Sequence, residues 1–173
     1  MRTLYLLRHG KSSWDDPTLA DRERPLAPRG RRDAKRIARH LVRQGVKPEL
    51  VLCSTAERTR ETLELMQTAL ADTSAIELED ELYGASADSL LERLRLVPGA
   101  VASVMMIGHN PALQDLALVL AAGGPDLERL EAKFPTAALA TLAFANATWA
   151  ELSPAEAVLA DWVIPRQLGA RAR

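Results

Sequence analysis

Short apolar runs alternate with stretches of helical periodicity along this chain of 173 residues. Such alternation is typical of a parallel sheet whose crossover helices cover its faces. No internal repeat, linker or domain boundary is evident, so residues 1–173 are expected to form one domain. The pattern predicts an α/β fold: a three-layer α/β/α sandwich with a central, mostly parallel sheet. Strands are expected at 2–8, 50–53, 75–79, 102–107 and 137–144.

Helix boundaries follow from capping residues. Helices are expected from about 33 to Gly45, from a capping box at 54–57 to about 70, and around 90–94 before Pro98. Asn110 is expected to cap a further helix, with Pro111 at its first position and its end at 123–124. Beyond residue 148 the pattern is weaker. Residues 153–156 could open a helix, yet a strand over 157–164 is favoured.

Composition excludes several classes of protein. The chain is 47% hydrophobic and 26% charged with a net charge of −1, which is ordinary for a globular protein and unlike a disordered tail, a fibre or a disulfide scaffold. No run approaches the ~18 apolar residues of a membrane span, and the apolar run 3–7 is too short for a signal peptide. One cysteine, Cys53, cannot form an internal disulfide. A cytoplasmic location without a membrane partner is expected.

The small net charge hides an uneven distribution. Residues 1–60 hold 15 Lys and Arg against 7 Asp and Glu, a balance of +8, and the remainder of the chain carries −9. Most of this surplus falls at 29–43 and is interpreted as the solvated face of a helix. Lys11, Arg22 and Arg24 follow the first strand, and they are expected to steer an anionic substrate.

Two of the three histidines lie where expected strands end. His9 stands in Arg8-His9-Gly10, at the end of the first strand, and His109 stands between a strand and a helix. Ligands of open α/β sheets bind beyond the carboxyl ends of the strands, so both histidines are candidates for a functional site. His40 lies among arginines on the polar side of a helix and is interpreted as a surface residue.

Arg58 adds a cation at a third strand end. It falls in the first turn of the helix that follows residues 50–53, and a helix N-terminus itself favours an anion. A guanidinium there suits bidentate contact with a phosphate. Alone, Arg58 would be expected to pair with Glu57 or Glu61 on a solvated helix. Beside His9 and His109 it is better explained as a phosphate ligand.

Other chemistries do not fit the spacing. A cysteine-based phosphatase needs five residues between Cys and Arg, whereas four separate Cys53 from Arg58. Neither a P-loop nor a Gly-x-Gly-x-x-Gly turn is present, and three scattered histidines with one cysteine do not have zinc-ligand spacing. Nucleic-acid-binding motifs are absent and aromatic residues make up 4% of the chain. No nucleic-acid partner is expected.

Together these motifs resemble the histidine phosphatase superfamily, the phosphoglycerate-mutase-like clan, and within it the small SixA-type phosphohistidine phosphatases. The resemblance covers essentially the whole chain. The segments that carry it are Arg8–Trp14, Asp21–Leu26 with Arg29-Gly30, Ser54–Thr62, Leu82-Tyr83 and Gly108–Pro111.

The resemblance implies a mechanism. His9 would be the nucleophile that carries a transient phosphohistidine, with its second ring nitrogen held by a backbone carbonyl. Arg8, Arg58 and a cationic His109 would surround the phosphoryl oxygens, so no metal or cofactor is expected. Three further residues of the matching segments are candidate phosphate ligands: Gly10, Ser12 and Asn110.

The general acid is the open point of this resemblance. Members of the clan place a carboxylate after the third strand to protonate the leaving group, and Glu81 is the nearest match, with Glu79 and Asp80 beside it. An ordinary acidic loop is the alternative interpretation. SixA-type members often lack a clear acid there. A leaving imidazole departs more readily than an alkoxide, so a phosphoramidate substrate needs less acid catalysis.

Three functions remain as hypotheses. The chain is expected to be a phosphatase acting on histidine-phosphorylated proteins. The first alternative is a small-molecule phosphomonoesterase that uses the same site. The second is a non-catalytic module that binds phosphate or a phosphoprotein, which would not need His9.

Overall fold

The computed structural model describes residues 1–70, 75–145 and 148–169. A seven-stranded sheet with the order β3-β2-β4-β1-β6-β7-β5 forms its centre. Strand β6 is antiparallel to both neighbours, and the other pairings are parallel. The strands are β1 (Arg2–Arg8), β2 (Leu50–Ser54), β3 (Ala75–Glu79), β4 (Ser103–Gly108), β5 (Ala121–Gly123), β6 (Leu139–Phe144) and β7 (Ala157–Val163).

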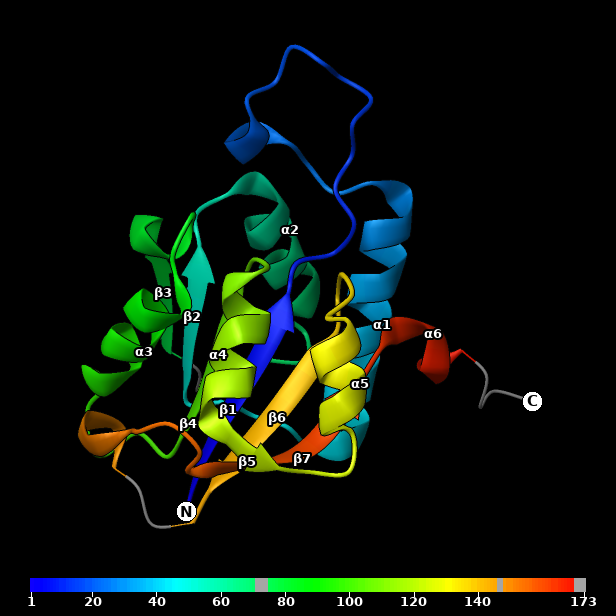
Figure 1. Ribbon diagram of the computed structural model, residues 1–173. Helices are drawn as coiled ribbons and strands as arrows, with labels where there is room; N and C mark the ends of the chain where they lie inside the picture. The colour runs from blue at the N-terminus through cyan, green and yellow to red at the C-terminus, as the bar shows by residue number, and fades with distance from the viewer. Residues whose placement is uncertain (71–74, 146–147, 170–173) are drawn as a thin grey trace.

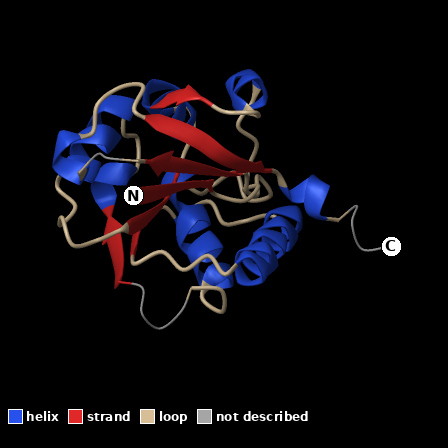
Figure 2. Ribbon diagram, turned by 90° about the horizontal axis from the view of Figure 1, so that it is seen from below, coloured by secondary structure: helices blue, strands red, loops and turns tan. Residues whose placement is uncertain are grey.

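Helices cover both faces of this sheet, which confirms the predicted α/β/α sandwich (Figure 2). On one face lie α1 (Pro28–Gln44), α2 (Glu57–Met66) and α6 (Pro165–Leu168). On the other lie α3 (Ala87–Arg95), α4 (Ala112–Leu120) and α5 (Leu127–Ala132). Short 3-10 helices occupy Asp21–Glu23, Asp80–Leu82 and Trp149–Glu151.

The central strand β1 contributes side chains to the hydrophobic clusters on both faces of the sheet. Its side chains alternate between faces: Leu4 and Leu6 join the cluster beneath α3 and α4, while Leu7 joins the cluster beneath α1 and α2. All three are fully buried. Burial on both faces explains why this strand is a continuous apolar run in the sequence. The core therefore fixes the end of β1, from which Arg8 and His9 project.

The helix after β1 begins earlier than predicted. The sequence indicated a start near Asp33, because Pro28 and Gly30 are typical of turns. Helix α1 instead begins at Pro28, which occupies its first turn, and it ends at Gly45 in the left-handed conformation as expected. Gly30 lies inside this helix. A glycine is needed there because a Cβ would clash with the Lys11 carbonyl oxygen.

Two predicted caps are wrong. The expected capping box at residues 54–57 is absent: Ser54 remains in β2, and α2 starts at Glu57 without a side-chain cap and ends at Met66. Helix α4 starts at Ala112 rather than Pro111, and the Asn110 side chain does not cap it. The hydroxyl of Ser54 accepts from the N–H of residue 56, a local turn that competes with the cap.

The end of the chain contains elements that periodicity missed. The favoured strand at 157–164 is confirmed as β7. Helix α4 ends at Leu120 rather than near residue 123, because β5 follows and pairs with β7. The sequence predicted neither β5, α5 nor α6.

His40 is not a surface residue, since its side chain is 12% exposed and its Nε2 lies 4.0 Å from the carboxylate of Asp161.

The helices of the described residues are all too short or too polar to cross a lipid bilayer.

Candidate active site

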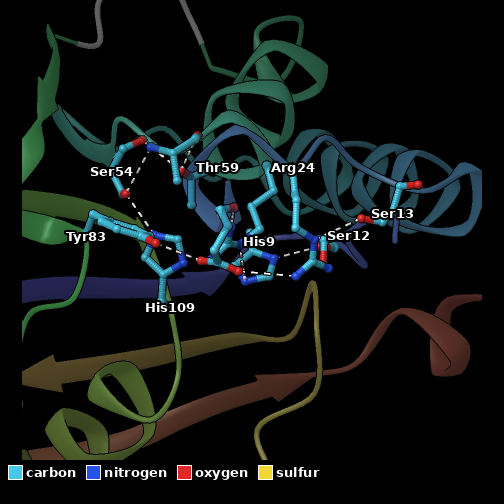
Figure 3. A network of polar contacts seen from close by, with 12 residues as sticks. His9, Ser12, Ser13, Arg24, Ser54, Thr59, Tyr83 and His109 are labelled. Atoms are coloured by element: carbon cyan, nitrogen blue, oxygen red, sulfur yellow. Dashed lines mark hydrogen bonds and ion pairs between the residues drawn. The ribbon is translucent and has the colours of Figure 1, made fainter. Parts of the chain in front are cut away.

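The candidate site lies at the carboxyl ends of three adjacent strands, β2, β4 and β1. Arg8 pairs with Gly108 in the parallel register of β1 and β4, so His9 and His109 follow equivalent positions of neighbouring strands. Their ring centroids are 5.2 Å apart. Ser54 ends β2 beside them. Figure 3 shows His9, His109 and Ser54 converging at this edge, as the sequence analysis expected for the two histidines.

His9 is held in one tautomer by the backbone. Its Nδ1 lies 2.7 Å from the carbonyl oxygen of Gly10, an atom that only accepts hydrogen bonds. Nδ1 therefore carries the proton, and Nε2 keeps its lone pair. The ring is buried, at 7% exposure. Burial lowers the pKa of His9 to about 3 against the opposing effect of the Gly10 carbonyl, with smaller contributions from His109, Arg58 and Arg8, so its imidazole is neutral at physiological pH.

Close backbone packing fixes the turn after His9. A Cβ on Gly10 would lie 2.7 Å from the carbonyl oxygen of Gly30 in α1, so only glycine fits. The N–H of Gly10 donates to the Thr62 hydroxyl at 3.1 Å, and that hydroxyl donates to the Arg58 carbonyl at 2.7 Å. The turn after His9 is thereby joined to both α1 and α2. The Gly10 N–H, a candidate phosphate ligand, is engaged by Thr62.

Arg58 reaches from the first turn of α2 to the imidazole of His9. Its Nε donates to His9 Nε2 at 3.3 Å. Its two other nitrogens bind Asp21: Nη1 donates to the backbone carbonyl at 2.7 Å, and Nη2 donates to the carboxylate at 3.0 Å. Arg58 is 8% exposed. The expected alternative pairing with Glu57 or Glu61 does not occur.

Asp21 and Tyr83 belong to the site although the sequence analysis assigned them no role. The Tyr83 hydroxyl donates to the Asp21 carboxylate at 2.7 Å, and these contacts with Tyr83 and Arg58 lower the carboxyl pKa. The Tyr83 ring packs edge-on against His109 with centroids 5.5 Å apart. Both residues lay within segments of the family resemblance. That membership was the only signal for them in the sequence.

His109 is neutral in this arrangement. Burial first and then Arg58 lower its pKa to about 4, and the Asp21 carboxylate opposes them. Its Nε2 lies 2.8 Å from the Ser54 hydroxyl. Its buried Nδ1 has no partner among the described residues. The Ser54 hydroxyl can donate to Nε2 or accept from it, according to which ring nitrogen carries the proton.

Arg8 is the last residue of β1 and directly precedes His9. Its Nη1 donates to the carbonyl oxygen of Phe134 at 2.8 Å, while its buried Nε has no partner among the described residues. Burial and the neighbouring Arg58 lower the pKa of this guanidinium. Two arginines close to one imidazole create a positive field that favours an anion.

The loop between β1 and α1 (residues 9–27) rises beyond the strand ends (Figure 1). Arg24 organises it: Nε donates to the Ser13 carbonyl at 3.0 Å and Nη2 donates to the Ser12 hydroxyl at 2.9 Å. Arg24 is 5% exposed and Arg22 pairs with Asp80. Arg24 therefore holds the loop and is not exposed to steer an anion, whereas the paired Arg22 side chain is 45% exposed.

The remaining predicted ligands lie at the edge of the site. The Ser12 hydroxyl is engaged by Arg24. The Asn110 amide donates to Gln114 and to the Phe134 carbonyl, both at 3.2 Å, and its buried Oδ1 has no partner among the described residues. Glu81 is exposed on the Asp80–Leu82 turn and, within the described part of the chain, makes no hydrogen bond to His9 or Arg58.

Cys53 is a core residue. It is fully buried, and burial raises the pKa of its thiol to about 12, which removes thiolate chemistry at neutral pH. The described residues contain no cluster of His, Cys, Asp or Glu side chains that could hold a metal ion.

These contacts define what the site can do. A neutral imidazole presents an unprotonated Nε2 that accepts from Arg58, and buried nitrogens of Arg8 and His109 have no partner among the described residues. An unprotonated imidazole nitrogen near two arginines suits a tetrahedral oxyanion such as a phosphate group.

Comparisons with known proteins agree with this geometry. The model of the histidine phosphatase superfamily (branch 1) matches residues 4–94, slightly more than half of the chain. An uncharacterised protein of Mycobacterium tuberculosis is 38% identical over 92% of this chain and its own full length.

Two solved structures are also similar. The candidate phosphohistidine phosphatase SixA of Agrobacterium tumefaciens has a TM-score of 0.79 at 32% identity, covering 95% of this chain and 98% of that one. The protein histidine phosphatase SixA complexed with tungstate has a TM-score of 0.78 at 26% identity, covering 96% and 99%. The chain therefore belongs to the histidine phosphatase superfamily.

Proposed function

We propose that this protein is a metal-independent phosphatase that removes phosphoryl groups from phosphohistidine on proteins through a covalent intermediate on His9. The observation that carries the proposal is the contact between His9 Nδ1 and the Gly10 carbonyl, which leaves Nε2 unprotonated, with its lone pair accepting only from Arg58. A histidine that only bound phosphate would do so best as a protonated donor, whereas a pKa of about 3 keeps His9 unprotonated.

The reaction proceeds in two displacements. Nε2 of His9 attacks phosphorus in line and the bond from phosphorus to the leaving imidazole breaks. The imidazole leaves as the neutral ring, because its other nitrogen already carries a proton. Water then attacks the phosphohistidine, which releases inorganic phosphate and restores neutral His9. The free nitrogens of Arg8 and His109 and the guanidinium of Arg58 stabilise the charge on the equatorial oxygens in both steps.

The similarity to a SixA structure that holds tungstate supports an oxyanion at this position, because tungstate has the tetrahedral shape and charge of phosphate. The names of the two SixA relatives support phosphohistidine as the substrate. A phosphoramidate substrate also agrees with the exposed position of Glu81, since its protonated imidazole leaves with less acid assistance.

The surroundings of the site support a protein substrate. Within the described residues, the loop at 9–27 lies beyond the strand ends and no helical subdomain covers them (Figure 1). The loop presents Trp14, which is 71% exposed and has the Arg24 guanidinium carbon 3.0 Å from its ring centroid. An exposed, stacked tryptophan beside an open site is suited to contact with another protein.

Trapping the intermediate tests the mechanism. The protein is mixed with a ³²P-labelled phosphohistidine phosphotransfer domain, quenched in alkali after milliseconds, and digested to locate the label. We expect label on His9 that is stable to alkali and labile to acid, and none in His9→Asn. Turnover with no label on His9, or turnover that persists in His9→Asn, would refute the covalent mechanism.

Substrate comparison tests the specificity. We expect kcat/KM for the phosphohistidine domain to exceed that for a panel of sugar and glycerate phosphates by orders of magnitude. The reverse order would favour the small-molecule phosphomonoesterase. Tight binding of phosphate without turnover of any substrate would favour the non-catalytic module.

A further inference from the structure

A second cationic region lies next to the candidate site. A cavity of about 320 Å³ opens between α1, the segment 133–136 before β6, and the start of α6. We name it the cationic cavity. Five basic side chains and one carboxylate line it: Arg29, Arg32, Arg36, Lys133, Arg166 and Asp33. The sequence analysis treated the charges of α1 as a solvated face, so this gathering across three segments was not predicted.

The positive charge of the cationic cavity is not balanced from within. Asp33 is buried and accepts from Arg36 at 3.0 Å, and it also lies 3.6 Å from Arg29. In the described part of the chain, the other three cations, Arg32, Lys133 and Arg166, form no ion pair. Like charges held around one cavity repel one another, and an anionic partner relieves that repulsion.

The cationic cavity and the candidate site share a wall. Pro135 and Thr136 line the cavity, and the residues on either side of them contact the site. The Phe134 carbonyl accepts from Arg8 at 2.8 Å, and the N–H of Ala137 contacts the His9 carbonyl at 2.9 Å. An anion in the cavity would therefore lie one short segment away from the phosphoryl group.

The opposite wall is connected to the nucleophile as well. Helix α1 carries three of the five cations, and its Gly30 packs against the backbone of Gly10 and Lys11. Ile164 and Pro165 provide an apolar, conformationally restricted part of the lining. The position of the cations relative to His9 is thus fixed by backbone packing rather than by flexible side chains alone.

We propose that the cationic cavity binds carboxylate side chains of the phosphoprotein substrate that flank its phosphorylated residue. The inference rests on the proposed function and names the charge of the substrate surface. The Arg29 side chain is 68% exposed and that of Arg36 is 39% exposed. Such hydrated cations bind a lone small anion weakly, but they steer and orient an acidic protein surface that the site already holds by its phosphoryl group.

A charge-exchange experiment tests this inference. Two synthetic phosphohistidine peptides differ only in four flanking residues, glutamate in one and glutamine in the other. The cavity variant is Arg32→Gln/Lys133→Gln/Arg166→Gln, which spares the ion pairs of Asp33. The control is Lys35→Gln/Arg39→Gln/Arg43→Gln, which removes the same charge from a groove between α1 and α2.

We expect the wild type and the control to prefer the glutamate peptide by about tenfold in kcat/KM at low salt. The cavity variant should lose this preference and keep its activity on p-nitrophenyl phosphate within about twofold. The preference of the wild type should also fade as salt is raised, because the contacts are exposed.

Three outcomes would overturn the inference. If the cavity variant keeps the preference, or if the control loses as much, the cationic cavity does not read flanking carboxylates. If the variant loses activity equally on both peptides and on p-nitrophenyl phosphate, its cations support the site itself. If the wild type hydrolyses p-nitrophenyl phosphate but neither peptide, the proposed function fails and the inference fails with it.

Discussion

The Nε of Arg58 lies 3.3 Å from Nε2 of His9, the ring nitrogen that is free to attack phosphorus. Because His9 Nδ1 contacts the Gly10 carbonyl, the lone pair of Nε2 accepts this hydrogen bond from the guanidinium. Under the proposed function, Arg58 orients His9 before substrate arrives and exchanges that contact for a phosphoryl oxygen during attack. One arginine thus connects the positioning of His9 with the binding of its target.

Removal of Arg58 should therefore cost at least as much as the loss of one preorganised phosphate ligand. We expect Arg58→Ala to lower kcat/KM for p-nitrophenyl phosphate by about 10²–10³, the scale for a preorganised donor. Steady-state kinetics beside Arg60→Ala, an exposed arginine of the same helix, provide the measurement and the control. A loss smaller than about tenfold would contradict a role for Arg58 in the transition state.

The acidity of His9 predicts an unusual pH profile. Burial lowers its pKa to about 3, and that of His109 falls to about 4. A lowered pKa means that the neutral, nucleophilic imidazole persists as pH falls through about 6.5, where a free histidine would gain a proton. We expect kcat/KM, corrected for ionisation of the substrate, to stay level through that region and to fall only towards pH 4.

The measurement is kcat/KM for p-nitrophenyl phosphate from neutral pH down to the acid limit of folding, with circular dichroism at each pH to show that the chain stays folded. An acid limb with a midpoint near the ordinary histidine pKa, arising from the enzyme, would show that His9 is not buried as described.

Sequence patterns located the strand ends because each strand is an apolar run that the core requires on both faces. They could not reveal Asp21, because the loop at 9–27 is shaped by contacts between distant residues, such as Arg24 with Ser12. The early start of α1 was hidden for the same reason. Gly30 lies within α1, and it is explained only by its close approach to Lys11, which is distant in sequence.

The same limit applies to β5 and to the cationic cavity. A strand of three residues has no period to detect, and it exists because β7 offers a free edge. Three segments supply the cations of the cavity, so no single window of sequence contains the cluster. Capping patterns failed where a local turn satisfied the hydroxyl first, as at Ser54.

Asp21 places a negative charge 3.0 Å from the Arg58 guanidinium, and this charge competes with a bound phosphate. We expect Asp21→Asn to lower the inhibition constant of inorganic phosphate or vanadate by about threefold, a modest effect because the carboxylate is 54% exposed. Asp80→Asn is the matched control, because Asp80 pairs with Arg22 instead. Weaker inhibition in Asp21→Asn would mean that the carboxylate chiefly positions Arg58.

Glu81 stays a candidate acid whose role depends on the leaving group. We expect Glu81→Gln to lower kcat/KM for an alkyl phosphate more than for a phosphohistidine peptide, because an alkoxide needs a proton more than an imidazole does. Both substrates are measured on the same preparation, with Asp80→Asn as the neighbouring carboxylate control. Equal losses on the two substrates would remove Glu81 from the reaction.

Gly30 is predicted to be essential for joining α1 to the nucleophile loop. A Cβ at this position would lie 2.2 Å from the Lys11 carbonyl oxygen, and neither backbone can yield without moving Gly10, which packs against the same turn. We expect Gly30→Ala to lower the free energy of unfolding by about 1–3 kcal/mol and to reduce kcat, since the displaced turn carries His9. Urea unfolding and steady-state kinetics measure the two effects.

In Gly99→Ala the added Cβ would meet no atom within 4 Å, so that variant should match the wild type. If Gly30→Ala matches it too, the close approach of α1 to the loop does not position the nucleophile.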